Sequence, residues 1–129
     1  MKRVGVYGWG IVAPKSPDIE TFKRNLSCTD DWLGPYEGFG PNTFLVGTPE
    51  FDFADYRAWI DERFPPNRFS QLVTKMDPFA LYAVGAFIQA LGQNPGIERV
   101  LQELQGQAHV YVGTGLGAFA AVHDATLRL

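Results

Sequence analysis

Apolar residues follow two kinds of spacing along the chain, and each kind predicts a different element. Residues 3–12 combine β-branched and aromatic side chains with glycine and carry little charge, which is typical of a strand buried on both faces. Residues 108–112 form a second run of this kind, and residues 44–46 form a shorter one. The pattern therefore predicts two or three strands, one near each end of the chain.

Helical spacing is clearest after Asp77 and Pro78. Aspartate is a favoured N-cap residue, and proline is favoured at the first position of a helix. Apolar residues then recur three and four positions apart up to Gly92, so we expect a largely buried helix. Ser16 and Pro17 predict the start of another helix in the same way. Besides the helix at residues 77–92, the sequence predicts helices at residues 18–26, 53–60, 94–106 and 119–129.

The order of elements, a strand followed by helices and then a strand, predicts an α/β fold with parallel pairing and a right-handed crossover. The 129 residues correspond to one domain. Two or three strands make a weak independent sheet, because an uncovered edge remains open to pairing. The helix predicted at residues 119–129 also lacks a C-cap, so we expect further structure after Leu129.

Composition narrows the function classes. With 46% hydrophobic and 19% charged residues, the chain is expected to be globular. A net charge of −3 argues against nucleic-acid binding. The single cysteine, Cys28, cannot form an intrachain disulfide, which favours a cytoplasmic location. No apolar run approaches the ~20 residues of a membrane span, and no cleavage site follows the apolar run after Arg3.

A glycine-rich segment at residues 113–118 matches G-x-G-x-x-G/A after a predicted strand. A dinucleotide fingerprint normally follows the first strand and is completed by an acidic residue about 20 positions later. That position lies beyond the chain, and Asp124 comes too early. A tight turn is therefore the favoured interpretation, and nucleotide binding the weakest of the functional hypotheses.

The remaining candidates for chemistry give no catalytic or metal signature. Cys28 follows a predicted helix end and has no histidine near it in sequence, so it lacks the features that activate a thiol. His109 and His123 do not have the spacing of a metal site or a triad. The pairs Asp30-Asp31 and Asp61-Glu62 are predicted to be solvated charges. No cofactor and no metal is expected.

Four segments resemble the β-ketoacyl-[acyl-carrier-protein] synthases, which have a thiolase-like fold. Residues 4–14 are similar to the opening strand and loop of this family, and residues 18–26 to its first helix. Lys75-Met76-Asp77 and the helix after it resemble the "Arg-Lys-Met-Asp" helix, and residues 110–117 resemble the second core strand with its glycine turn. The resemblance covers nearly the whole chain.

The resemblance implies that residues 1–129 are an incomplete, N-terminal portion of a thiolase-like ketosynthase domain. Such enzymes condense malonyl-carrier protein with an acyl thioester by decarboxylation, in fatty acid or polyketide synthesis. The family's nucleophilic cysteine and two histidines come later than this sequence extends, and Cys28 does not match the context of that nucleophile. We therefore expect the 129-residue chain to be inactive alone and the intact enzyme to be a homodimer.

The resemblance also implies three site residues. Lys75 corresponds to a lysine of the family's docking patch for the acidic acyl carrier protein, where cations accelerate encounter. Thr74 stands where the family has arginine, a departure for which Arg68 or Arg63 is expected to compensate. Leu116 corresponds to the wall of the acyl pocket. The alternative interpretations are a solvated charge for Lys75 and ordinary core for Leu116.

A second hypothesis from another class is that the chain is a non-catalytic, ketosynthase-related partner that shapes the acyl pocket of a full-length subunit. A partner of this kind forms a defined complex, whereas a lone fragment aggregates or exchanges strands. Neither hypothesis involves a membrane or a nucleic acid.

Overall fold

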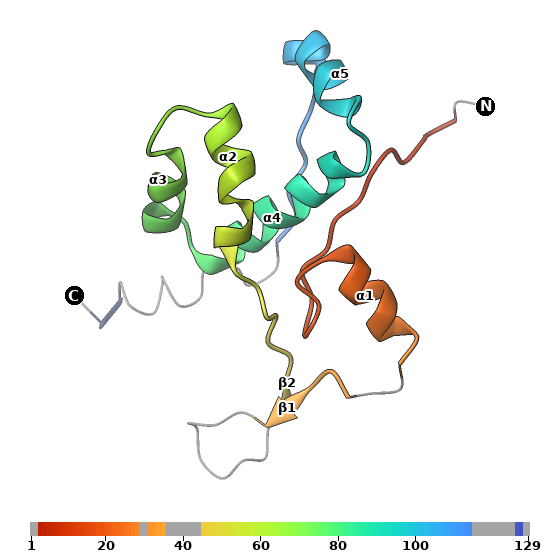
Figure 1. Cartoon of the computed structure of the whole chain (residues 1–129), viewed down its shortest axis with the longest axis vertical. Helices are drawn as coiled ribbons and strands as arrows, with labels where there is room; N and C mark the ends of the chain where they lie inside the picture. Colours follow the sequence, from red (N-terminus) through yellow and green to blue (C-terminus); the bar gives the residue numbers. More distant parts are fainter. Residues whose placement is uncertain (1–2, 29–30, 36–44, 115–125, 128–129) are drawn as a thin grey trace.

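The computed structural model of the chain describes residues 3–28, 31–35, 45–114 and 126–127. Within these ranges the fold is a mixed α/β arrangement, in which helices predominate and one small sheet joins two strands (Figure 1). In chain order the elements are α1 (Ile19–Leu26), β1 (Gly34–Pro35), β2 (Leu45–Val46), the 3-10 helix η1 (Phe53–Tyr56), α2 (Arg57–Arg63), α3 (Arg68–Lys75), α4 (Pro78–Gly92), α5 (Ile97–Leu104) and the 3-10 helix η2 (Gln105–Gln107).

The sheet is antiparallel, with Gly34 opposite Val46 and Pro35 opposite Leu45. The short strand predicted at residues 44–46 is therefore confirmed for Leu45–Val46. Its partner, β1, was not predicted, because a Gly-Pro pair carries no strand pattern of its own.

The two longer strands predicted at residues 3–12 and 108–112 are wrong for this structure, since neither segment belongs to a strand. Their side chains are largely in solvent, with Val4 94% and Tyr111 91% exposed. A strand is defined by the ladder it makes with a neighbour. Among the described residues no other strand lies beside either segment, so the parallel pairing expected from the sequence is also not formed.

The N-terminal segment instead lies along α4 (Figure 1). The Trp9 amide donates to Gln93 Oε1 at 3.3 Å, and the Ile11 amide donates to Gln89 Oε1 at 3.2 Å. Gln89 Nε2 in turn donates to the carbonyl oxygen of Pro17 at 2.8 Å, just before α1. The side chains of Gln89 on α4 and of Gln93, its C-cap, therefore satisfy backbone groups that a neighbouring strand would satisfy in a sheet.

The main hydrophobic core lies where η1, α2, α3 and α4 meet. Its buried members are Phe53, Ile60 and Ile88, and the Phe53 ring stacks on Phe69 of α3 with centroids 5.5 Å apart. The prediction of α4 from Asp77 to Gly92 is confirmed. The helix is less buried than expected, because Phe79 and Phe87, among others, remain exposed while a narrower face packs inward.

The N-cap of α1 is Asp18, whereas the sequence predicted Ser16. Asp18 Oδ1 accepts the Thr21 amide at 2.8 Å, and Asp18 Oδ2 accepts the Thr21 hydroxyl at 2.9 Å. Ser16 is fully buried, and its hydroxyl oxygen accepts a hydrogen bond from Asn25 Nδ2 at 3.0 Å. Ser16 therefore packs against the end of α1 while Asp18 begins the helix.

The Asp18 cap gives stability a measurable pH dependence. The Thr21 amide hydrogen bond lowers the pKa of Asp18 below its ordinary value of 3.8. A lowered folded-state pKa means that the stabilisation is complete above the unfolded value and is lost as the pH falls through the folded one. We expect Asp18→Ala to lower the free energy of unfolding by about 1 kcal/mol at neutral pH. Urea titrations over pH 2 to 7 should show this difference shrink at acid pH; a pH-independent difference would contradict the assignment.

Within the described part of the chain, no helix is both long and apolar enough to cross a bilayer.

Candidate functional site

Helix α3 brings together the two residues expected to contact a carrier protein. Arg68 begins the helix and Lys75 ends it. Seven positions in an α-helix return to the same face after two turns, so the two cations lie on one face, about 10.5 Å apart along the axis. Both residues are exposed. We call this face, together with the exposed Gln71 between them, the α3 cationic face.

The sequence signal for α3 is weak. Phe69 and Leu72 lie on the inner side of α3 and pack against the core. They are three positions apart, which is a helical spacing, but two residues are too few to define an amphipathic helix from the sequence. Asn67 precedes the helix with φ of 74°, a left-handed conformation that asparagine tolerates better than most residues. The helix ends at Met76, whose amide donates to the Leu72 carbonyl at 2.9 Å.

The charges of the α3 cationic face have no carboxylate partner in the described ranges. Neither Arg68 nor Lys75 takes part in an ion pair there, and α3 contains no acidic residue. Thr74, which stands where the resembled family has arginine, donates its hydroxyl to the Ser70 carbonyl at 2.7 Å. Two exposed cations of this kind contribute little to stability but attract an acidic partner over several ångströms.

Arg63, the other arginine considered from the sequence, is paired with carboxylates. Its guanidinium donates to Glu98 of α5 at 2.9 Å and to Glu62 at 2.6 Å, and it lies over the Trp59 ring at 4.4 Å from the centroid. The Glu98 hydrogen bond is also the main cause of a raised Arg63 pKa. Of the two arginines considered from the sequence, only Arg68 has a charge without a carboxylate partner among the described residues.

An apolar hollow adjoins the α3 cationic face. It measures about 360 Å³ and is lined by Phe64, Pro65, Pro66, Arg68 and Gln71. Phe64 is 43% exposed, so an aromatic ring stands open to solvent beside a free guanidinium. An apolar contact surrounded by charge is the usual composition of a protein docking surface.

The other residues considered from the sequence do not join this site. Leu116, the residue expected in the acyl pocket, lies outside the described residues, as do His123 and most of the glycine-rich turn. Cys28 is a free, exposed thiol on the C-terminal side of α1. His109 is exposed and has a ring contact with Tyr111. Within the described ranges, no three histidine, cysteine or acidic side chains are grouped to hold a metal ion.

Comparisons of the chain with protein-family models, with curated proteins and with solved structures found no match. The residues and geometry of α3 are therefore the basis for a functional proposal.

Proposed function

We propose that the chain is the N-terminal portion of a β-ketoacyl-[acyl-carrier-protein] synthase with a thiolase-like fold, and that α3 docks the acidic acyl carrier protein. The intact enzyme condenses malonyl-carrier protein with an acyl thioester as a cytoplasmic homodimer. The 129 residues alone have no condensing activity, because they contain none of the three groups that the family uses for this chemistry. Their contribution is to bind and orient the carrier protein.

The observation that carries the proposal is the α3 cationic face. Arg68 and Lys75 lie on one face of one helix, exposed and without carboxylate partners in the described ranges. Arg68 also lines a hollow in which the Phe64 ring is exposed. Lys75 directly precedes Met76-Asp77, in one of the four segments that resemble the family. Charge of this sign and arrangement suits an acidic partner.

Two exposed apolar segments support the view that the sheet is incomplete. The resemblance implies that residues 4–14 and 110–117 belong to core strands of the intact enzyme, whereas here Val4, Val110 and Tyr111 are each more than 80% exposed and form no strand. Further strands alongside them would bury these side chains, at a gain of about 25 cal/mol for each Å² of apolar surface removed from water.

Reversing both charges of the α3 cationic face should weaken carrier binding. We expect Arg68→Glu with Lys75→Glu to raise the Kd for acyl carrier protein by at least about tenfold, mainly by slowing association. The same variant should lose most of the salt dependence of binding. Thr74→Arg, which restores the family's residue, should lower the Kd by about threefold. Isothermal titration at low and high salt measures all three effects.

A matched control changes the same net charge elsewhere. Lys23→Glu with Arg99→Glu alters exposed cations on α1 and α5, both of which are paired with carboxylates on their own helices. This variant should bind carrier protein within about twofold of the original chain. Equal losses in the two double variants would mean that only net charge matters, and the α3 docking site would be rejected.

A further inference from the structure

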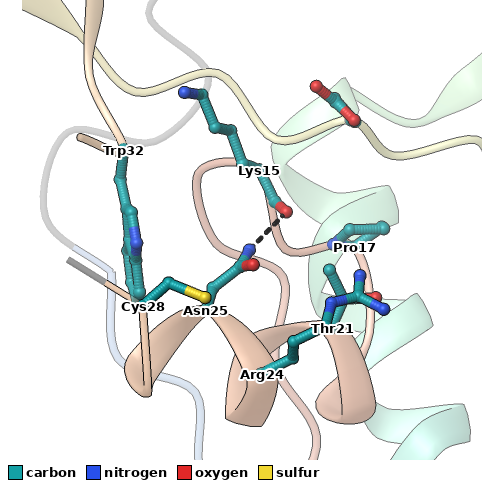
Figure 2. A pocket seen from close by; sticks show the side chains of 8 residues that line it. Lys15, Pro17, Thr21, Arg24, Asn25, Cys28 and Trp32 are labelled. Carbon is teal, nitrogen blue, oxygen red and sulfur yellow. Dashed lines mark hydrogen bonds between the residues drawn. The ribbon is translucent and has the colours of Figure 1, made fainter. Parts of the chain in front are cut away.

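A second cavity lies between α1 and the chain segments on either side of it. It measures about 350 Å³, within the range of small-molecule sites. Figure 2 shows Trp32 on one side of this cavity, Thr21 and Arg24 on the other, and Lys15 above them. None of these residues takes part in the α3 cationic face.

The lining of the α1 cavity is cationic. Lys15 and Arg24 supply two positive charges, and Glu50 is its one acidic lining residue. None of the three forms an ion pair within the ranges described, although Arg24 lies close enough to Asp18 to help lower the pKa of that carboxyl. The chain as a whole has a net charge of −3, whereas the charged residues that line the cavity include two cations and one carboxylate. An anion is the ligand that this arrangement favours.

Lys15 is held in a conformation that its side chain does not favour. Its φ is 51°, in the left-handed region, at a turn position where glycine or asparagine is the usual residue. Three hydrogen bonds fix it there: its amide donates to the Thr48 carbonyl at 3.2 Å, its carbonyl accepts Asn25 Nδ2 at 2.9 Å, and Nζ donates to the Asp31 carbonyl at 2.7 Å. Strain that is retained in this way frequently marks a binding site.

The other walls of the cavity supply a polar contact and an aromatic surface. Asn25 Nδ2 donates to the Lys15 carbonyl and to Ser16 Oγ, which fixes the side-chain amide at the cavity. Trp32 packs edge-on against Phe22 with centroids 5.7 Å apart, so its indole is held in place. Because the indole is already held in place, a planar ligand can stack on it without having to immobilise the side chain.

We propose that the α1 cavity binds a small organic anion, whose phosphate or carboxylate group is attracted by Lys15 and Arg24 from two sides of the cavity while Trp32 packs against a planar ring. Lys15 already donates one hydrogen bond to the Asp31 carbonyl, and an ammonium group has two further donors. The guanidinium of Arg24 adds a planar donor set that suits either anionic group. The site is separate from α3 and does not depend on carrier-protein docking.

Cys28 provides a direct readout, because it lines the cavity, is exposed and is the single cysteine of the chain. Its reaction with the neutral disulfide 4,4′-dithiodipyridine would be timed in a phosphate-free buffer. We expect phenyl phosphate or benzoate at about 10 mM to slow the reaction at least about fivefold, and benzyl alcohol to leave it unchanged. Comparison of the two anions identifies whether the phosphate ester or the carboxylate is the preferred group.

Variants establish whether the two cations are responsible. Lys15→Gln and Arg24→Gln should each raise the concentration needed for protection by about tenfold. Lys23→Gln, which removes a neighbouring charge that is paired with Glu20 outside the cavity, should not. Lys15→Gly keeps the left-handed turn without strain, so it should retain or raise the unfolding temperature and still lose protection.

The proposal is overturned if neither anion slows the reaction of Cys28. It is equally overturned if both anions protect Lys15→Gly as well as the original chain, because the lysine side chain would then have no part in binding.

Discussion

Replacing Ile60 with alanine is expected to lower the free energy of unfolding by about 3 kcal/mol. Ile60 is 1% exposed and packs in the core with Phe53 and Ile88. The substitution removes three buried carbons and leaves a cavity where η1, α2 and α4 meet. Urea unfolding followed by circular dichroism measures the loss, which is a large share of the stability of a small domain.

The matched control for Ile60→Ala is Val73→Ala on α3, where the valine is 47% exposed. This change removes apolar carbons from a site in contact with water, and alanine favours the helix, so the free energy of unfolding should stay within about 0.5 kcal/mol. Equal effects at the two positions would show that α2, α3 and α4 do not share the core described above.

Replacing Gly10 with alanine is expected to cost about 2 kcal/mol of unfolding free energy, the second-largest effect. A Cβ at this position would overlap the backbone carbonyl of Ala86 in α4, and a helix backbone cannot move aside as a flexible side chain does. The N-terminal segment would lift from α4 and break the hydrogen bond from the Ile11 amide to Gln89. Hydrogen exchange at the Ile11 amide should accelerate accordingly.

Gly106→Ala is the control for Gly10→Ala, because a Cβ at Gly106 meets nothing within 4 Å. This variant should unfold at nearly the same urea concentration as the original chain. If Gly10→Ala were as stable as Gly106→Ala, with unchanged exchange at Ile11, the close approach of residues 8–11 to α4 would be wrong.

The contrast between α4 and the two predicted strands shows which parts of the fold the sequence determines locally. Asp77 and Pro78 begin α4 because capping and φ restriction act within a few residues. A strand needs a partner from elsewhere in the chain, and residues 3–12 have β-like composition without such a partner among the described residues. Instead, glutamine side chains of α4 and its C-cap satisfy two amides of that segment, an arrangement that composition does not reveal.

The candidate site was likewise predictable in part. The sequence indicates Lys75 and Arg68 as docking residues, but it does not indicate that they share a helix face, because α3 carries only a short apolar repeat. Arg63 and Arg68 look equivalent in the sequence. They differ because Glu98, 35 positions away, pairs with Arg63, and only the tertiary structure brings α5 beside α2.

The α1 cavity was not predicted at all. Lys15, Arg24 and Trp32 belong to a turn, a helix and a loop, and no spacing pattern connects them. The one local signal is a lysine directly after Pro14, in a turn where glycine or asparagine is expected. That departure from turn preference distinguishes Lys15 from the other lysines of the chain, but it does not indicate which residues surround it.

The most direct test of carrier docking by α3 is an amide NMR titration of the ¹⁵N-labelled chain with acidic acyl carrier protein at low salt. Docking predicts chemical-shift changes concentrated in residues 64–75, around the apolar hollow and the α3 cationic face, and their loss as salt is raised. Shift changes confined to other segments, or none at carrier concentrations of about 1 mM, would contradict the proposed function.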